Sequence, residues 1–487
     1  MSEPPGPAPA GGRSDPSRAL RRDPQFVLLA TVVCLEAVGI GVLFPLLAHV
    51  QDAHHLPTYT LGLMSGASFF AALVAQLGAG PLLDGNRARP VLLFGVLLGA
   101  GGLVWFAFAG GLGGLVGARG LGGVGYGIVS PAALRQASLG VSGERRGKRL
   151  GILSSAQMAG FTVGPLFGSV LYAAGGLRVP FEVVGGLLAV AGAGLALLPA
   201  PQATRRPRPA RVAPAHSSAK HPPGWGAPSA PPARAGAPPR GRPLNDGPRV
   251  LGERWRELSG IEVAPLVAML LLAAALQLPN GLYDSLWSRM LTDRGASALL
   301  IGLSFSFFGL PFVVLAPLGG RVAERRGPLL AAGLGLLAAD CFMAAYGFVP
   351  WPILIVGLGV GEACVQSVAI PGGFASVGRV FSDDRIAAGQ GLFGGIGTLA
   401  AGTAAVAGAP VFAALGGPGA FGGGAAVSAA LVVAALVVGR QSRLAAPGTG
   451  AAAGAGAGDT PAPSAARRGG QEATEEAVQT DLPGPGA

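Results

Sequence analysis

The sequence predicts an all-α membrane protein with twelve transmembrane helices arranged in two pseudo-symmetric six-helix halves. Hydrophobic residues make up 50% of the chain and charged residues only 12%, whereas an ordinary soluble domain has about 25% charged residues. The apolar residues fall into blocks of about 20 residues, which is the length that crosses a bilayer as a helix. The two halves of the chain also share a repeated sequence pattern.

The apolar blocks form two groups of six, separated by a polar segment. The first group lies near residues 25–49, 61–83, 90–109, 112–134, 150–174 and 179–199, and the second near 262–286, 298–318, 328–348, 351–375, 387–412 and 419–439. Residues 200–259 are rich in Pro, Ala and Arg and have no periodic apolar face, which predicts a disordered linker. We therefore expect six-helix bundles at 25–199 and 260–440, with disordered ends at 1–24 and 441–487.

Basic residues predict the orientation, because Lys and Arg in short loops stay on the cytoplasmic side of a membrane. Alternate loops are rich in Arg and Lys, whereas the intervening loops carry only Arg178, Arg289 and Arg294. Both termini and the linker fall on the basic side, so we expect a multi-pass plasma-membrane protein with cytoplasmic N- and C-termini. The net charge of +11 follows from this asymmetry and from attraction to membrane lipid, and we expect no nucleic-acid partner.

An internal repeat relates the two halves of the chain. Residues 61–80 align without gaps on residues 301–320, which places Gly62 opposite Gly302 and Gly80 opposite Gly320. Parallel repeats of this kind place a substrate site between the two halves, near the middle of the bilayer. We therefore expect alternating access by rocking of one half against the other.

Several short motifs lie in or beside the apolar blocks. They comprise Glu36 in the first block; Gly80, Asp84, Arg87 and Arg89 after the second; Arg119 in the fourth; Gly160, Gly164, Pro165 and Gly168 in the fifth; and Gly320, Glu324, Arg325 and Arg326 after the eighth. Together they resemble motifs of the major facilitator superfamily and, within it, of the twelve-span drug:proton antiporters. The resemblance covers approximately residues 25–440.

The resemblance implies the major facilitator fold and a role for each motif. The clusters around Asp84 and Glu324 would latch the cytoplasmic side in one transport state, as a cytoplasmic gate. A topology determinant with a solvated turn is the alternative, since Gly85 and Arg87 stand where the family has a basic residue and a glycine. The glycine motif that begins at Gly160 would serve antiport, with ordinary helix packing as the alternative.

Glu36 is the sharpest candidate for proton coupling, because a charge near the bilayer centre costs about 2.5–3.5 kcal/mol. Burial favours the neutral form of a carboxyl group, so Glu36 is suited to exchange protons. Counting about 1.5 Å per residue along each helix puts Arg119 at a similar depth. We therefore expect Arg119 beside Glu36, with protonation and substrate binding in competition; a purely structural pair is the alternative.

Other polar residues inside the blocks are candidates for lining a substrate cavity. These are Gln76, Tyr126, Gln157, Asp284, Glu362 and Gln366. The three cysteines lack the spacing of a metal site or a disulfide framework, and no G-x-x-x-x-G-K-[ST] motif for ATP is present. We expect neither a cofactor nor a metal.

These observations predict a monomeric transporter rather than an enzyme, one that exchanges protons for a small hydrophobic or cationic compound and expels it. A symporter or uniporter of the same fold that moves a metabolite is the alternative. A membrane receptor or scaffold is a third possibility, but it would need neither duplicated halves nor acidic residues inside the membrane.

Overall fold

A computed structural model of the chain describes residues 23–83, 87–139, 141, 143–198, 262–382, 385–440 and 444. Within these ranges the structure is helical and contains no β-strand, which confirms the all-α prediction. Of the segments predicted to be disordered, 1–24, 200–259 and 441–487, all residues except 23, 24 and 444 lie outside the described residues, so the predicted domain boundaries stay predictions.

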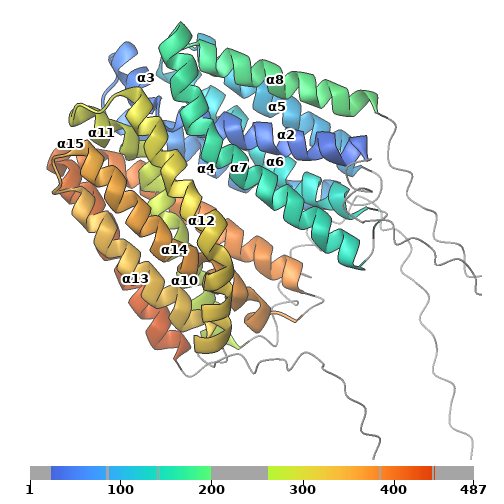
Figure 1. Ribbon diagram of the computed structural model, residues 1–487, viewed down its shortest axis with the longest axis vertical. Helices are drawn as coiled ribbons and strands as arrows, with labels where there is room; N and C mark the ends of the chain where they lie inside the picture. Colours follow the sequence, from blue (N-terminus) through green and yellow to red (C-terminus); the bar gives the residue numbers. More distant parts are fainter. Residues whose placement is uncertain are drawn as a thin grey trace, which may run out of the picture. The chain divides into compact units, whose positions relative to one another are not determined.

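Helices follow one another through both halves of the chain (Figure 1). The first half contains α2 (Pro24–Leu43), α3 (Leu47–Ala53), α4 (Tyr59–Leu82), α5 (Ala88–Phe108), α6 (Leu112–Ser138), α7 (Gly143–Gly175) and α8 (Val179–Leu197). The second half contains α10 (Val263–Leu282), the π-helix η1 (Tyr283–Trp287), α11 (Ser288–Asp293), α12 (Ala298–Arg326), α13 (Pro328–Tyr346), α14 (Pro352–Val380) and α15 (Ile386–Gly439).

Every predicted span overlaps a helix, but not every helix has the length and hydropathy of a single membrane span. Among the described residues, nine helices are long and apolar enough to cross a membrane, or ten if the bent helix α12 counts as one. Helix α6 falls outside this set because it is rich in glycine and contains Arg119. Helix α15 carries two predicted spans, joined at Gly416, whose φ of 67° interrupts the helical geometry.

The first predicted span is shorter than expected, because α2 ends at Leu43 and α3 begins only at Leu47. Pro45 lies in this break, and proline has no backbone N–H to continue a helix. At its start, α2 is capped by the side chain of Asp23, which accepts a hydrogen bond from the backbone N–H of Phe26 at 3.2 Å. Asp23 also forms an ion pair with Arg149 of α7, and the Arg149 guanidinium lies 4.9 Å from the Phe26 ring centre.

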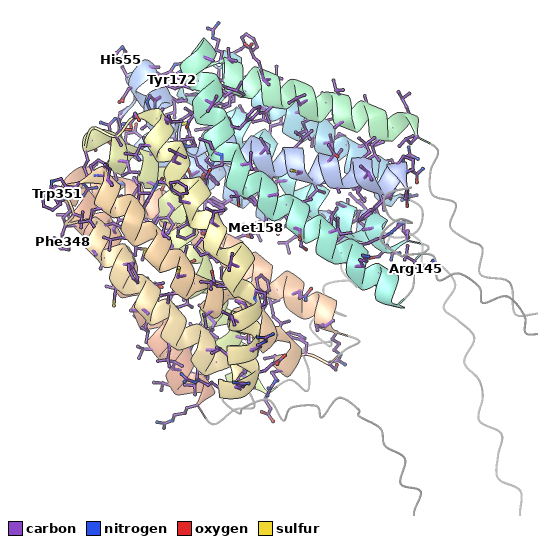
Figure 2. All side chains as sticks on the ribbon, viewed as in Figure 1. His55, Arg145, Met158, Tyr172, Phe348 and Trp351 are labelled. Carbon is purple, nitrogen blue, oxygen red and sulfur yellow. The ribbon has the colours of Figure 1, made fainter. Side chains whose placement is uncertain are left out.

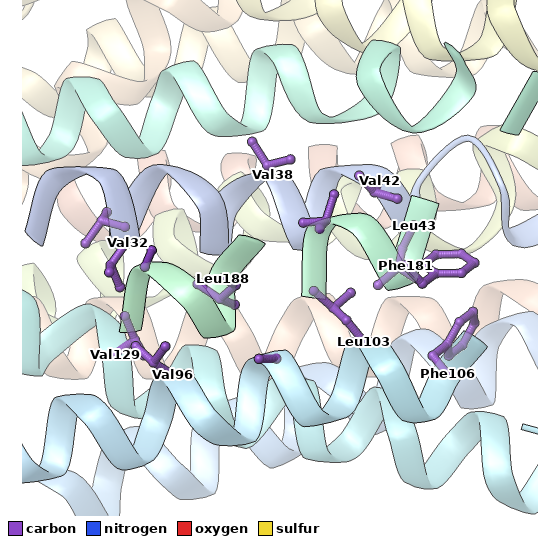
Figure 3. Close-up of a cluster of buried hydrophobic side chains, with 14 of the residues drawn as sticks. Val32, Val38, Val42, Leu43, Val96, Leu103, Phe106, Val129, Phe181 and Leu188 are labelled. Carbon is purple, nitrogen blue, oxygen red and sulfur yellow. The ribbon is translucent and has the colours of Figure 1, made fainter. Parts of the chain in front are cut away.

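Buried apolar side chains form clusters that each belong to one half. In the first half, side chains of α2, α5, α6 and α8 interdigitate (Figure 3). The second half contains two such clusters, one around Leu272 and Leu336 and the other around Trp287 and Phe421. Each half therefore has its own packed interior, and contacts between the halves are made along a few helices.

Helix α4 packs against α15, and α7 packs against α12, so two seams join the halves. The glycines that the repeat aligns lie one on each seam: a Cβ atom at Gly62 would lie 2.9 Å from the Cβ of Ala409, and one at Gly302 would lie 2.7 Å from the carbonyl oxygen of Pro165. Glycine is required at both positions because the neighbouring helix leaves no room for a side chain.

The short helices α3 and α11 also contact each other across the halves. The backbone N–H of Ala48 donates to Ser288 Oγ at 3.2 Å, and Arg289 Nη1 lies 2.5 Å from Asp52 Oδ1. We call this end of the helices the α3–α11 end. Along α7, Tyr172 lies toward this end and Arg145 lies at the opposite end (Figure 2).

Candidate functional site

Ionisable side chains are buried inside both halves of an otherwise apolar helical protein. Glu36, Arg119, Asp284 and Glu362 are each no more than 6% exposed. Burying such groups without partners is costly, so their surroundings indicate what they do.

Arg119 of α6 and Asp284 of η1 form a buried ion pair that joins the two halves. Arg119 Nη2 lies 2.6 Å from Asp284 Oδ2, and both side chains are 4% exposed. The pair makes a single hydrogen bond, because Arg119 Nε and Asp284 Oδ1 are buried and have no partner among the described residues. A one-point contact of this kind is weaker than a bidentate pair, which suits an interaction that has to break and re-form.

Among the described residues, no ion pair or hydrogen bond joins Arg119 to Glu36, so the expected pair is not formed in this structure. Counting residues along a helix gives the depth of a side chain but not the direction in which it points. Asp284, considered in the sequence as a substrate contact, is the actual partner of Arg119. The Pro279-Asn280 sequence just before η1 was the available signal, since helix irregularities of this type often occur at functional positions.

Glu36 faces a pocket between α2, α6 and α7. The pocket is small, with room for about one water molecule, and Glu36 Oε1 is buried with no hydrogen-bond partner among the described residues. Polar groups of Ser130, Ser154 and Gln157 also line it, and Gln157 Nε2 donates to the Tyr126 hydroxyl at 3.3 Å. The remaining lining is apolar: Val33, Val129, Ala133, Leu134 and Leu153. An unpartnered carboxyl oxygen in this setting can take a proton or a hydrogen-bond donor of a ligand.

Glu362 of α14 has its hydrogen-bonding capacity met by the protein. Its Oε1 accepts from the Tyr283 hydroxyl at 2.7 Å and from Gln366 Nε2 at 2.6 Å. Its Oε2 accepts from the Tyr346 hydroxyl at 2.5 Å. The structure thus brings Glu362 and Gln366 together, as their spacing on one helix predicts, but the two tyrosines were not predicted. Contact of this pair with a substrate stays a prediction.

A family model described as the Major Facilitator Superfamily matches residues 29–283 and 269–469. The chain belongs to this superfamily. It is therefore a multi-pass membrane transporter, and the resemblance in the sequence motifs is confirmed at the level of the superfamily.

Two curated members of the superfamily match part of the chain. Multidrug resistance protein 2 of Bacillus subtilis (strain 168) is 26% identical over 156 residues, which are 32% of this chain and 39% of that protein. An uncharacterised MFS-type transporter of Methanocaldococcus jannaschii is 27% identical over 154 residues, which are 31% of this chain and 40% of that protein. The chain thus spans about two fifths of the length of each relative.

Solved structures of superfamily transporters share the fold over most of the chain. An inward-facing, unoccupied bacterial homologue of the human lysosomal transporter Spinster has a TM-score of 0.62 at 17% identity, and covers 87% of this chain and 96% of its own. The nucleoside transporter NupG, as the D323A mutant, has a TM-score of 0.62 at 14% identity and covers 85% and 99%. These similarities establish the major facilitator fold.

Among the described residues, the candidate gate residues form no ion pair across the halves. Arg89 donates to the last carbonyl oxygens of α8, including that of Leu195 at 2.5 Å. Glu324, Arg325 and Arg326 are exposed and form no ion pair with another described side chain, and Gly80 and Arg87 are also exposed. A Cβ atom at Gly320 would meet no atom within 4 Å. Asp84 lies outside the described residues, so the gate stays a prediction.

One polar candidate, Gln76, stands apart from the others. Gln76 is half-buried on α4, away from the hydrogen bonds described above. Within the part of the chain that the structure describes, no group of three or more His, Cys, Asp or Glu side chains could hold a metal ion.

The glycine motif of α7 packs directly on α2. A Cβ atom at Gly160 would lie 2.7 Å from the Cβ of Ala37, one at Gly164 would lie 2.9 Å from the carbonyl oxygen of Val38, and one at Gly168 would lie 3.0 Å from the Cα of Val42. The contact supports close helix packing as one role of the motif, and it fixes α7 against the helix that carries Glu36.

We expect Gly160→Ala to destabilise the protein by about 1–3 kcal/mol, because the added methyl group forces α7 away from α2. Thermal unfolding of the purified protein in detergent measures the effect. Gly151→Ala is the matched control, since a Cβ atom at Gly151 on the same helix meets nothing within 4 Å. Equal melting temperatures for the two variants would contradict the packing role.

Proposed function

We propose that this superfamily member is a proton-coupled antiporter that expels a small hydrophobic or cationic compound by alternating access. The observation that carries the proposal is the Glu36 side chain, which lines a small pocket between α2, α6 and α7 and has a buried carboxyl oxygen without a partner among the described residues. A carboxylate there attracts a proton or a cationic group, and it holds only one of them at a time. Competition between the two at Glu36 couples substrate movement to proton movement.

Contacts between the halves support an alternating-access cycle. The halves contact each other at the α3–α11 end, where Asp52 meets Arg289 and Ala48 meets Ser288. The opposite end carries the exposed arginines of α12. In our proposal the α3–α11 end faces away from the cytoplasm, the basic end faces the cytoplasm of a plasma membrane, and the arrangement is the inward-facing one.

The chemistry of the pocket supports the substrate class. Its lining residues are apolar except for Glu36, Ser130, Ser154 and Gln157. In our proposal, the cationic or hydrogen-bonding group of an otherwise apolar molecule binds beside Glu36. The multidrug resistance protein among the relatives agrees with this class. In our proposal, protons and membrane lipid are the further partners, and the chain acts as a monomer.

Uptake of ethidium, a permanently charged hydrophobic cation, into proteoliposomes tests the proposal. With the lumen one pH unit more acidic than the bath, exchange of one proton for one cation can give at most about a tenfold accumulation. We expect the native chain to accumulate ethidium and Glu36→Gln to give no accumulation, because the amide cannot bind the proton. Glu182→Gln, at an exposed acidic residue of α8, is the control and is expected to retain accumulation.

The alternatives give different results in the same assay. A uniporter would only equilibrate the compound, and a symporter would accumulate it in the direction of proton flow. Unchanged accumulation in Glu36→Gln would show that another group couples the two fluxes.

A further inference from the structure

The π-helix η1 connects two buried polar clusters through neighbouring residues. Its five residues, Tyr283–Trp287, are all buried. Tyr283 donates to Glu362 inside the second half, and the next residue, Asp284, binds Arg119 of the first half. The π-helical geometry places consecutive residues toward two different partners, so a shift of η1 changes both contacts together.

Contacts across the halves continue along the chain from η1. Ser288, which follows Trp287, accepts from the backbone of Ala48, and Arg289 binds Asp52. Residues 284–289 therefore carry three separate contacts to the first half. Inside the second half, two hydrogen bonds hold this segment. The Tyr283 hydroxyl donates to Glu362, and Trp287 Nε1 donates to Ser304 Oγ at 2.9 Å.

The hydrogen bonds of Glu362 depend on its protonation state. As a carboxylate it accepts all three donors, from Tyr283, Tyr346 and Gln366. A protonated carboxyl group has to donate one hydrogen bond itself, so at least one of the three donors must turn away or become an acceptor. No Arg, Lys or His among the described residues contacts Glu362, so protonation leaves no buried cation unpaired.

We infer that Glu362 is a second proton-binding group of the transport cycle, and that Tyr283 transmits its protonation state to the Arg119–Asp284 ion pair. Ionised Glu362 holds η1 in the position from which Asp284 reaches Arg119, which keeps the α3–α11 end closed. Protonated Glu362 loosens Tyr283, η1 shifts, and the end opens more readily. Tyr283 is thus a positioning residue, and the inference rests on the proposed alternating-access function.

The titratable groups around Glu362 come from η1 and α13. From α13 it faces Tyr346 and Asp340, and from η1 it faces Tyr283; the described residues of α10, α12 and α15 add no charged partner. Asp340 is 5% exposed. Beyond η1 the charged pair is Arg119 with Asp284, and it responds to the position of η1.

Distance measurements between spin labels at the α3–α11 end test the inference. Labels at Ala53→Cys and Phe348→Cys, both at exposed positions (Phe348 is labelled in Figure 2), report the separation of the halves when Cys34, Cys341 and Cys364 are replaced by alanine. In the full chain in lipid nanodiscs, without substrate or gradient, we expect the distance to increase as the pH falls. We expect Glu362→Gln to abolish this response.

Two tyrosine variants form a matched pair, because each removes one hydroxyl donor from Glu362 and keeps its ring. Tyr283 belongs to η1, whereas Tyr346 belongs to α13. We expect Tyr283→Phe to lose the pH response of the distance and Tyr346→Phe to keep it with a shifted midpoint. A response that survives Tyr283→Phe, or that both variants lose equally, overturns the role of Tyr283.

Infrared difference spectra of the chain with its native cysteines provide a second readout that does not need labels. To remove the contribution of Glu36, the spectra are compared in a Glu36→Gln background. The component of the protonated-carboxyl band that belongs to Glu362 is expected in Glu36→Gln and in its combination with Tyr283→Phe, and lost in the combination with Glu362→Gln. A band of unchanged intensity in that last combination would overturn the inference. The inference is also overturned if Glu36→Gln abolishes the pH response of the distance and Glu362→Gln retains it, and the proposed function is then unaffected. If instead the native chain shows the pH response that depends on Glu362 but does not couple ethidium uptake to protons, only the proposed antiport is overturned.

Discussion

Replacing Asp284 with asparagine is expected to open the α3–α11 end and to stop transport. The substitution keeps the shape of the side chain but leaves the Arg119 guanidinium, which is 4% exposed, without a counter-charge. Breaking one side of a buried ion pair costs about 3–5 kcal/mol. The pair joins the two halves in the arrangement that is closed at this end. We therefore expect the cost to fall on that arrangement, so that the equilibrium moves toward one in which Arg119 reaches water.

Spin-label distances at the α3–α11 end measure the shift in population, and thermal unfolding measures the loss of stability. Asp293→Asn is the control, since it removes an exposed ion pair with Arg289 that is worth at most about 1 kcal/mol. The double variant Arg119→Gln with Asp284→Asn removes the stranded charge and is expected to recover part of the loss. If Asp284→Asn behaved like Asp293→Asn, the pair would have no role in closure.

Placing a leucine at Gly302 is expected to hold the two halves apart and to reduce transport to background. The Cβ atom alone would lie 2.7 Å from the carbonyl oxygen of Pro165, on the backbone of α7. Helix backbones do not yield to such a contact, and overpacking typically costs about 1–3 kcal/mol even where side chains can move. We expect Gly62→Leu on the α4–α15 seam to have the same effect, because it meets Ala405 and Ala409 in the equivalent way.

The same spin-label distances, together with ethidium uptake, check this pair of variants. Gly186→Leu on α8 is the control, since a Cβ atom at this exposed glycine meets nothing within 4 Å. Normal transport in either seam variant would mean that the seam is not required to close during the cycle.

Much of the fold could be predicted from the sequence because apolar block length is a strong constraint in lipid. Every predicted span overlaps a helix. The repeat in the sequence aligned Gly62 with Gly302, and the structure places one of them on each seam. The structure does not reproduce the predicted count of twelve spans directly, because only nine or ten of the described helices meet the length and hydropathy of a span. Helix α6 dilutes its apolar residues with glycine, and α15 joins two spans at Gly416.

The site could be predicted only in part. The buried acids Glu36 and Glu362 were identified because charge is rare inside a membrane. The partner of Arg119 was not, since it lies 165 residues away in the chain. The Pro279-Asn280 sequence indicates an irregular helix there, but it does not give the direction in which Asp284 points. The hydroxyl groups of Tyr283 and Tyr346 were missed for a related reason, because a tyrosine in an apolar block is indistinguishable from a packing residue until its neighbours are known.

The cap at the start of α2 limits how far the N-terminus can be shortened for biochemical work. Asp23 serves both as the capping residue of α2 and as the counter-ion of Arg149. A truncation that stops at residue 22 leaves both interactions in place. Removing one further residue would fray the helix that carries Glu36 and leave a guanidinium unpaired beside the Phe26 ring, so affinity tags belong upstream of this position.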